Sequence, residues 1–446
     1  MRVYRSWGRY PRATHTGVLP VLWRADPPPL DRLDQSVLPF GCGRSYGDSC
    51  LNDGGLLLDT AGLDRLIAFD PVAGLLRCEA GVTLADILAL TVPKGWFLPV
   101  VPGTRWVSVG GAIANDIHGK NHHVDGWFAR HVQSISLLTP AYGVQRVGPD
   151  QQPEFFWATA GGLGLTGIIL DATLQLLPIQ TSWMRVAAEQ AWDLDDLLER
   201  LADRSAAHRY AVAWIDCAAN GRRLGRGIVD SAEHATLDDL PGPACTALTF
   251  RPRTYLTVPF TSPVCMARTP TCRAFNASRL LLARARPQFT LTQAARFFFP
   301  LDAVGGWNRL YGRQGFVQYQ LAVPSSATGV LQAIVETIAT HRRAAALAVL
   351  KRLGEGGPML SFPIPGWTLS IDLPAAQPGL GRLLDGFDAI VAAAGGRVYL
   401  GKDSRLRRAA FEAMYPQLSE WQELRQQLDP AQVLRSDLAR RLGLVG

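Results

Sequence analysis

Residues 102–131 read PGTRWVSVGGAIANDIHGKNHHVDGWFARH, and no other stretch of the chain is as unusual in composition. Gly103, Gly110, Gly111 and Gly119 interrupt it too often for a stable helix or strand. Glycine at this density lets a backbone approach a ligand closely, or supplies positive φ in tight turns. Four of the eight histidines of the chain also fall within these residues. We therefore interpret the stretch as the floor of a cofactor site.

The length and composition describe a globular protein of two domains. The chain has 446 residues, of which 48% are hydrophobic and 19% charged. The net charge of +7 is modest, and no dense Lys/Arg tract predicts a nucleic-acid groove, although an anionic ligand or membrane surface fits. The chain contains only four lysines, Lys94, Lys120, Lys351 and Lys402. A retained lysine can be needed for its titratable ammonium, and chance retention on the surface is the alternative.

Cysteine usage and the N-terminus indicate where the protein works. Seven cysteines without a C-x-x-C pair argue against a zinc site or a disulfide framework and favour a reducing compartment. The N-terminus lacks the apolar core of a secretory signal, and no uncharged apolar run reaches the roughly 18 residues of a membrane span. We expect a cytoplasmic protein or one peripheral to the inner membrane, with the periplasmic face possible through partners.

Hydrophobic periodicity predicts a mixture of helices and strands. Thr83 is the expected N-cap of a helix that stops at Pro93, and residues 132–148 are expected to form a strand pair. Residues 1–36 are expected to wrap the surface. Further strands are predicted at 37–40, 56–60, 66–70, 75–81, 210–218, 317–324, 347–354, 360–374 and 397–404, the last ending near Lys402, and further helices at 193–205, 329–344, 380–396 and in the last 40 residues.

Residues 250–315 show little clean periodicity. They are rich in arginine, proline, threonine and aromatic residues. Residues 251–260 and 296–307 fit long mobile loops with an apolar, basic face, and equally an ordinary loop with a buried apolar strand.

Three separated glycine clusters indicate a dinucleotide. GCGRSYGD at 41–48 follows a strand, and its N–H groups could hold a pyrophosphate, but it lacks the G-x-G-x-x-G spacing of a Rossmann turn. GGAIANDIHG at 110–119 and GGLGLTG at 161–167 add further backbone donors. We therefore reject a Rossmann NAD(P) site and expect a different dinucleotide-binding fold.

Four motifs, PGTRWVSVGGAIANDIHGKNHH, FWATAGGLGLTGII, LSFPIPGW and YLGKDSR, resemble the decaprenylphosphoryl-β-D-ribose 2-oxidase family of the vanillyl-alcohol oxidase superfamily. The resemblance runs from about residue 38 to the C-terminus and is weak across about 181–310. It implies an α+β, two-domain flavoprotein of the vanillyl-alcohol-oxidase type. The FAD-binding domain would span 1–180, the substrate-binding domain 181–396, and residues 397–446 would complete the FAD domain.

The same resemblance implies the residues that contact FAD. They are Pro39, Phe40, Gly41, Cys42, Gly43, Arg44, Ser45, Tyr46, Gly47, Asp48, Ser49, Gly103, Ser108, Val109, Gly110, Gly111, Asn115, Asp116, Ile117, His118, Ile169 and Tyr399. Many oxidases of the superfamily bond the flavin to a histidine in the first loop. Arg44 occupies that position here and cannot make the bond, so we expect non-covalent FAD, with His118 a non-covalent contact.

The substrate and catalytic residues are carried over in the same way. Lys402, Tyr46 and His118 would be catalytic, and Gln318, Gln320, Lys351, Ser370 and Lys402 would contact substrate. Lys402 could act as a base if burial lowers its pKa, or as an ammonium that stabilises negative charge, and the sequence leaves both open. Gln318 and Gln320 lie two apart on a strand and so share a face, either toward a sugar or toward solvent. The mycobacterial enzymes carry a cysteine where this chain has Ser370 and an asparagine where it has Thr368, which puts thiol-dependent inhibition in doubt.

The resemblance implies oxidation of the C2 hydroxyl of a polyprenylphosphoryl ribose to a 2-keto sugar. This is the first half of an epimerisation to the arabinose form, used for cell-wall arabinan, and a separate NAD(P)H-dependent reductase would complete it. The alternatives are an aldonolactone or alditol oxidase with a soluble substrate, and a non-enzymatic flavin-binding scaffold. Peripheral membrane contact through 250–315 is expected, and nucleic acid is not. His118, His122 and His123 have roughly the spacing of metal ligands, but nothing fixes a geometry, so no metal is expected.

Overall fold

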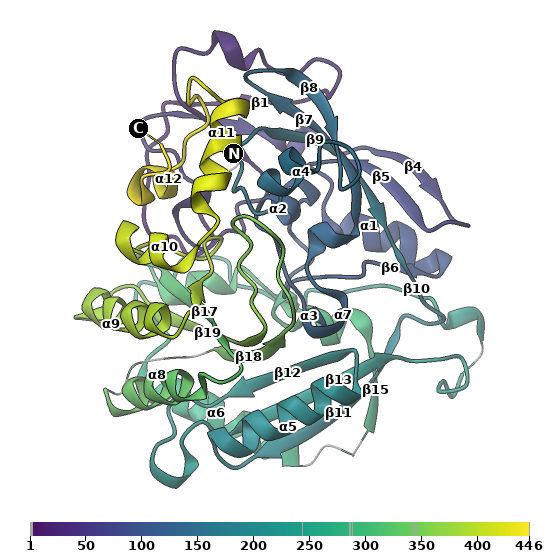
Figure 1. Ribbon diagram of the computed structural model, residues 1–446. Helices are drawn as coiled ribbons and strands as arrows, with labels where there is room; N and C mark the ends of the chain where they lie inside the picture. Colours follow the sequence, from purple (N-terminus) through teal and green to yellow (C-terminus); the bar gives the residue numbers. More distant parts are fainter. Residues whose placement is uncertain are drawn as a thin grey trace.

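The computed structural model describes residues 3–242, 244–284, 287, 289–341, 343, 345 and 347–445. Figure 1 shows an N-terminal half, in purple and blue, above a large sheet in teal and green, with the C-terminal helices in yellow along one side. Helices and sheets are both extensive, so the predicted α+β class is confirmed. None of the helices in the described ranges is long and apolar enough to cross a membrane.

The N-terminal half contains three small sheets. β1 (Gly17–Pro20), β3 (Leu56–Asp59) and β2 (Val37–Phe40) pair in parallel in that order. An antiparallel sheet follows in the order β4 (Leu66–Asp70), β5 (Leu75–Glu79), β9 (Ile168–Gln175), β7 (Val132–Thr139) and β8 (Gly143–Val147), and β6 (Trp96–Phe97) pairs with β10 (Leu177–Pro178). The helices here are α1 (Leu84–Thr91), α2 (Val109–Ala114), α3 (His122–Asp125) and α4 (Pro153–Thr159).

The second half is built on one antiparallel sheet of eight strands. Their order is β15 (Phe289–Gln293), β11 (Trp183–Ala191), β13 (Gly227–His234), β12 (Tyr210–Ile215), β18 (Ala348–Leu353), β19 (Gly366–Pro374), β17 (Phe316–Pro324) and β20 (Arg397–Val398). Helices α5 (Leu194–Ala207), α8 (Thr328–Thr340) and α9 (Leu380–Ala393) cover one face, as Figure 1 shows. Along the chain, the first strand of this sheet is β11, which begins close to residue 180, where a change of domain was predicted. The domain boundaries themselves stay a prediction.

Strand alternation gives this sheet two different faces. On β17 and β19 the odd-numbered residues, such as Tyr319 and Ile371, join the apolar core under the helices. The even-numbered Gln318, Gln320 and Ser370 point the other way and line a cavity against the N-terminal half. The side of the sheet without the three helices is therefore the polar side of a site.

Two N-terminal predictions have different outcomes. Thr83 caps α1 as predicted, because its hydroxyl accepts from Asp86 N while the Asp86 carboxylate accepts from Thr83 N. The prediction that glycines exclude a helix from 102–131 is wrong, since α2 contains Gly110 and Gly111. Ser108 caps α2, and a Cβ at Gly110 would lie 3.0 Å from the Ala80 Cβ. Close packing, which only glycine permits here, stabilises the helix in place of intrinsic propensity.

Residues 250–315 are more ordered than mobile loops. They contain β14 (Leu256–Thr257), α6 (Thr269–Arg284), β15, α7 (Ala294–Phe298) and β16 (Val304–Gly305). Phe298 and Phe299 are buried. The structure of 296–307 is therefore closer to a loop with a buried apolar segment than to a mobile loop, but that segment includes part of helix α7 and is not the expected strand. Some positions of the predicted elements and regions lie outside the described residues. They are residue 243, residues 285, 286 and 288 of the region 250–315, and residues 342 and 344 of the predicted helix 329–344.

The C-terminal segment ties the two halves together. It forms α10 (Arg408–Met414), α11 (Leu418–Leu428) and α12 (Asp437–Leu442), as predicted. The Arg441 guanidinium lies 2.8 Å from carboxylate oxygens of both Asp48 and Asp403. The predicted strand at 397–404 is only two residues long, because Lys402 N donates to Tyr399 O and turns the chain. Lys402 therefore stands beyond the sheet edge.

Candidate active site

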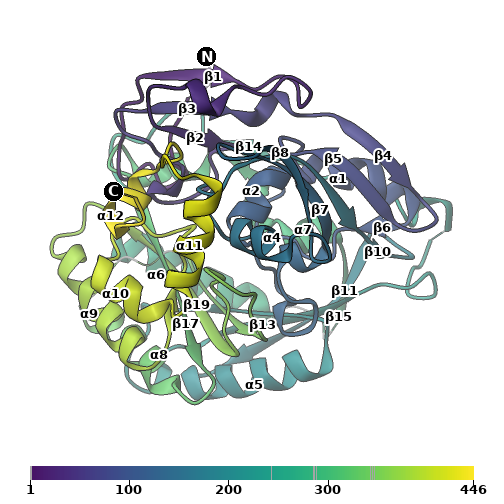
Figure 2. The ribbon, with the colours of Figure 1, turned by 45° about the horizontal axis from the view of Figure 1, so that its top comes forward.

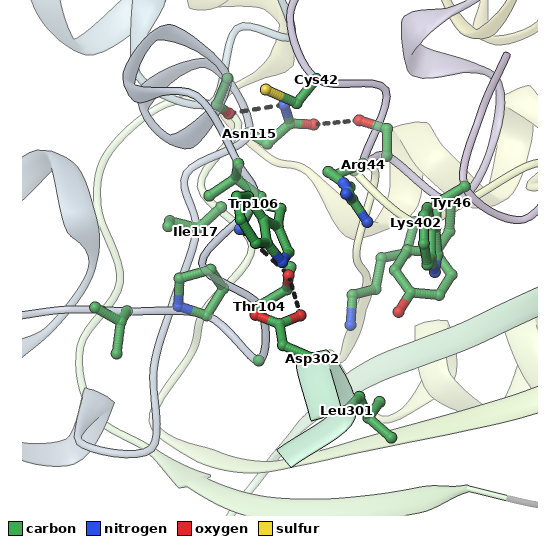
Figure 3. A pocket seen from close by; sticks show the side chains of 18 of the residues that line it. Cys42, Arg44, Tyr46, Thr104, Trp106, Asn115, Ile117, Leu301, Asp302 and Lys402 are labelled. Carbon is green, nitrogen blue, oxygen red and sulfur yellow. Dashed lines mark hydrogen bonds between the residues drawn. The ribbon is translucent and has the colours of Figure 1, made fainter. Parts of the chain in front are cut away.

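A cavity of about 1110 Å³ separates the polar face of the large sheet from the N-terminal half. All three glycine clusters and the sheet contribute to its wall, and Figure 3 shows part of it. The predicted residues that line it are Pro39, Phe40, Gly41, Cys42, Gly43, Arg44, Ser45, Tyr46, Ser49, Gly103, Ser108, Gly110, Gly111, Asn115, Ile117, His118, Ile169, Tyr399, Gln318, Gln320, Lys351, Ser370 and Lys402. Residues far apart in the chain thus share one cavity.

Four predicted cofactor residues do not line the cavity. A Cβ on Gly47 would collide with the Asp403 carbonyl oxygen, and Asp48 pairs with Arg441. Val109 is fully buried, and the Asp116 carboxylate accepts from the Ser361 hydroxyl. These residues are turned into the protein on either side of the lining residues, so they support the two loops from behind.

The first glycine loop presents backbone donors to the cavity. Gly43 adopts φ +61°, and the N–H groups of Gly43, Arg44 and Ser45 have no hydrogen-bond partner among the described residues. Ser45 Oγ donates to Asn115 Oδ1 at 3.4 Å, and Asn115 Nδ2 donates to Gly111 O at 2.9 Å, which joins this loop to α2. Unpaired N–H groups beside a cavity fit the phosphates of a dinucleotide. The loop therefore fits the pyrophosphate of FAD.

Arg44 is held by an aromatic residue of the N-terminal segment. Its guanidinium carbon lies 4.2 Å from the centroid of Trp7. Trp7 also lines the cavity, so residues 1–36 do more than wrap the surface as predicted. Arginine has no nucleophilic ring nitrogen, and Arg44 points into the cavity in Figure 3.

Lys402 lies against Tyr46, which belongs to the same loop as Arg44. Its Nζ is 5.3 Å from the Tyr46 ring centroid, and the two side chains lie side by side in Figure 3. Burial lowers the pKa of Lys402 to about 8, and the charge of Asp372 opposes that shift. Burial also raises the pKa of Tyr46, so its phenol stays protonated. Of these two side chains, Lys402 is therefore the one that changes charge near neutral pH.

Strand register brings the polar residues of the sheet together. Gln318 pairs with Asp372 and Gln320 with Ser370 across β17 and β19, and Lys351 pairs with Thr368 across β18 and β19. Gln320 Nε2 donates to Thr368 Oγ1 at 3.0 Å. Gln318, Gln320, Lys351 and Ser370 line the cavity and form a polar floor beside Lys402, suited to sugar hydroxyls. Thr368 and Asp372 are buried behind them.

Asp372 was not predicted from the sequence. Its side chain is fully buried and its Oδ1 accepts from Gln318 Nε2. Burial raises the pKa of Asp372 to about 7, against the Gln318 hydrogen bond and the charge of Lys402. The sequence pattern that could have identified Asp372 is the alternation of Thr368, Ser370 and Asp372, which places three polar residues on one face of an otherwise apolar strand.

His118 orients the polar floor. It is 6% exposed, and its Nε2 lies 2.8 Å from Gln320 Nε2. The amide nitrogen can only donate, so His118 Nε2 accepts and the ring proton is on Nδ1. Burial and the charge of Lys351 lower the pKa of His118 well below its usual value, which keeps the ring neutral. This arrangement suits a hydrogen-bonding role better than the predicted catalytic role, which remains a prediction.

Asp302 is a second residue that sequence reasoning missed. Thr104 Oγ1 donates to Asp302 Oδ1 at 2.7 Å, and Arg105 N donates to Asp302 Oδ2 at 3.0 Å. These bonds fix the start of 102–131 against the chain segment around η8 (Pro300–Ala303), and Figure 3 shows the one between Thr104 and Asp302. Among the described residues no group of three or more His, Cys, Asp or Glu side chains could hold a metal ion.

Two protein-family models match the chain. One, described as an FAD binding domain, matches residues 30–148, and one, described as D-arabinono-1,4-lactone oxidase, matches residues 319–442. The decaprenylphosphoryl-beta-D-ribose oxidase of Mycolicibacterium smegmatis is 38% identical over 99% of this chain and 97% of its own length. The chain belongs to the decaprenylphosphoryl-β-D-ribose oxidase family. It is an FAD-dependent oxidoreductase that acts on CH–OH groups, as the resemblance predicted.

Two further relatives show how far the similarity of this chain to other oxidases extends. An uncharacterized protein of Streptomyces coelicolor is 43% identical over 81% of the chain and all of its own length. The L-gulonolactone oxidase of Scyliorhinus torazame is 29% identical over only 32% of each protein. Similarity to the lactone oxidases is thus distant and partial, whereas similarity to the ribose oxidase covers both the flavin loops and the sheet.

Proposed function

We propose that this oxidase removes a hydride from C2 and a proton from the C2 hydroxyl of a polyprenylphosphoryl ribose and yields the 2-keto sugar. The observation that carries the proposal is the position of Lys402, which stands between Tyr46 of the first flavin loop and the polar floor of the sheet. The name of the mycobacterial relative supports the same substrate class.

Each residue of the site has a role that follows from the chemistry of its side chain. FAD, when bound, accepts hydride from the substrate carbon. Gln318 and Gln320 hold sugar hydroxyls, and His118 fixes the Gln320 amide. Lys402 takes the hydroxyl proton when its amine is neutral, or stabilises negative charge as an ammonium. With its pKa at about 8, both forms are populated near neutral pH.

The test is anaerobic mixing of the FAD-loaded enzyme with lipid-linked ribose, followed by the loss of flavin absorbance. We expect bleaching with lipid-linked ribose and little with free ribose or D-arabinono-1,4-lactone. Faster bleaching by the lactone would replace this proposal with the second candidate, a soluble aldonolactone or alditol oxidase. That candidate has one specific support, the match of residues 319–442 to the lactone oxidase model.

Acid precipitation should release the flavin into the supernatant. Arg44 stands where a covalent linkage would form and its guanidinium cannot make it, so FAD should be held by contacts alone. The measurement is the absorbance spectrum of supernatant and pellet after precipitation. Yellow colour that stays in the denatured pellet would contradict non-covalent binding.

We also propose that the enzyme docks on an anionic bilayer through residues 251–282. Tyr255 is 80% exposed, Phe260 68%, and Leu281 and Leu282 67% each. Arg251, Arg253, Arg268 and Arg273 are exposed in the same segment. Apolar side chains interleaved with arginines suit the interface of an anionic membrane, where a lipid-linked substrate resides.

Sedimentation with phosphatidylglycerol vesicles tests this docking. The double variant Tyr255→Ser/Phe260→Ser should lose most vesicle binding and keep its turnover of detergent-dispersed substrate. Trp192→Ser removes an aromatic residue that is 64% exposed outside the segment, so it is the matched control and should bind as before. Equal sedimentation of the double variant and the control would rule out this surface.

The proposed product also requires a partner reaction. A 2-keto sugar becomes the arabinose epimer only after hydride addition to C2, so we propose an NAD(P)H-dependent keto-sugar reductase as the functional partner. Adding such a reductase to the reaction should convert lipid-linked ribose to lipid-linked arabinose. Accumulation of the keto sugar in its presence would argue against the pairing.

A further inference from the structure

Three of the four lysines of the chain line the same cavity. They are Lys402 beyond β20, Lys351 on β18 and Lys120 between α2 and α3, whereas Lys94 is exposed elsewhere. Burial, together with the charges of Lys402 and Lys120, lowers the pKa of Lys351 to about 7. Lys402 follows β20, and Lys120 O accepts from Ala211 N of β12. Because β18 lies between β12 and β20 in the sheet, Lys351 is the middle member of a row of three lysines.

Among the described residues, none of these ammonium groups has a carboxylate within ion-pair distance, although the charge of Asp372 reaches Lys402 from farther away. Within the described part of the chain, no ion pair involves Lys120, Lys351 or Lys402. Lys120 Nζ donates to Phe297 O and lies 4.0 Å from the Phe297 ring centroid, and Lys351 Nζ donates to Gly119 O at 3.4 Å. The charge of Asp230 acts on Lys120 only from beyond ion-pair distance. Buried cations without a carboxylate partner favour an anionic ligand.

The cavity continues past Lys120 along the sheet. In sheet order its wall passes from Gln318 on β17, through Lys351 on β18, to Trp214 on β12, Val186 on β11 and Leu291 on β15. Six strand spacings correspond to about 25–30 Å, far longer than a ribose. Beyond β18 much of this wall is apolar, and the Arg279 guanidinium of α6 lies 4.9 Å from the Trp214 ring centroid. The site thus has a cationic middle and a largely apolar end.

We propose that Lys351 and Lys120 bind the phosphate of the lipid-linked sugar, and that the wall formed by β12, β11 and β15 takes the first isoprene units of its chain. The proposal rests on the proposed function and adds the position of the phosphate and the lipid. Its geometry follows from the substrate, because the phosphate is on C1, next to the carbon that Lys402 serves. The next lysines along the row are then the phosphate ligands, and the chain leaves away from Lys402.

The test uses farnesyl phosphate and farnesol as probes of the FAD-loaded protein, with binding measured by equilibrium dialysis. We expect wild-type protein to bind farnesyl phosphate at least 10-fold more tightly than farnesol. Lys120→Met should weaken farnesyl phosphate binding about 10-fold or more and leave farnesol binding unchanged. Lys94→Met is the matched control, because that lysine is exposed outside the cavity. Retained FAD shows that each variant is folded.

Chain length tests the apolar end separately. Isopentenyl phosphate should bind at least 10-fold more weakly than farnesyl phosphate, and Leu291→Glu should remove this difference. Unchanged farnesyl phosphate affinity in Lys120→Met, with normal oxidation of lipid-linked ribose, would overturn the subsite and leave the proposed function intact. If farnesyl phosphate binding depends on Lys120 but lipid-linked ribose is not oxidised, the proposed function is overturned and the subsite is retained.

Discussion

Replacing Lys402 with methionine should lower the rate of flavin bleaching by lipid-linked ribose about 10³-fold. Methionine keeps much of the length of the side chain and removes the amine that lies 5.3 Å from the Tyr46 ring centroid. FAD should stay bound, because the unpaired amides of Gly43, Arg44 and Ser45 are untouched. The measurement is single-turnover absorbance, with Lys94→Met as the control that should behave as wild type.

A second variant at this position separates the two roles of Lys402. Lys402→Arg keeps the positive charge but cannot accept a proton at ordinary pH. Recovery of most of the rate in the arginine variant would assign the lysine to charge stabilisation, and a loss as deep as that of methionine would assign it to proton transfer. A non-enzymatic scaffold makes a different prediction, since neither substitution would alter its function.

Replacing Asp372 with asparagine should lower turnover about 10-fold and move the pH profile. The carboxylate raises the pKa of Lys402, so its removal lowers that pKa further below about 8. The limb of the kcat/KM profile that reports Lys402 should therefore shift about one pH unit toward acid, whichever form of the lysine is active. Asparagine also changes the partner of Gln318, which accounts for part of the rate loss.

The control for this variant is Asp388→Asn. Asp388 is another buried aspartate of the same half, and it accepts from Tyr319 Oη at 3.1 Å on the helix-covered side of the sheet. Its substitution should lower stability without moving the pH limb. An unshifted limb in Asp372→Asn, with normal FAD content, would show that Asp372 does not act on Lys402.

The sequence predicted which residues line the cavity better than it predicted the helices and strands that carry them, and the roles of these residues stay a prediction. Glycine loops and Lys402 could be found because their residue types are rare and their motifs are local. Asp302 and Trp7 could not, since their roles depend on contacts with Arg105 and Arg44 across the fold. Helix α2 was missed because tertiary packing of Gly110 on Ala80 overrides the low helix propensity of glycine. Residues 269–284 form a helix that the weak periodicity did not reveal.

The contact of Gly47 with Asp403 has a consequence for how the enzyme matures in the cell. The first flavin loop is made early in translation, yet its backing is Asp403 and Arg441, which leave the ribosome near the end of synthesis. Until these residues have been synthesised, the loop lacks the packing and ion-pair contacts that hold it in place, and Lys402 is absent from the cavity. FAD binding and assembly of the catalytic centre should therefore both occur late, after the C-terminal segment has been synthesised. A partly synthesised chain should neither bind FAD stably nor oxidise substrates.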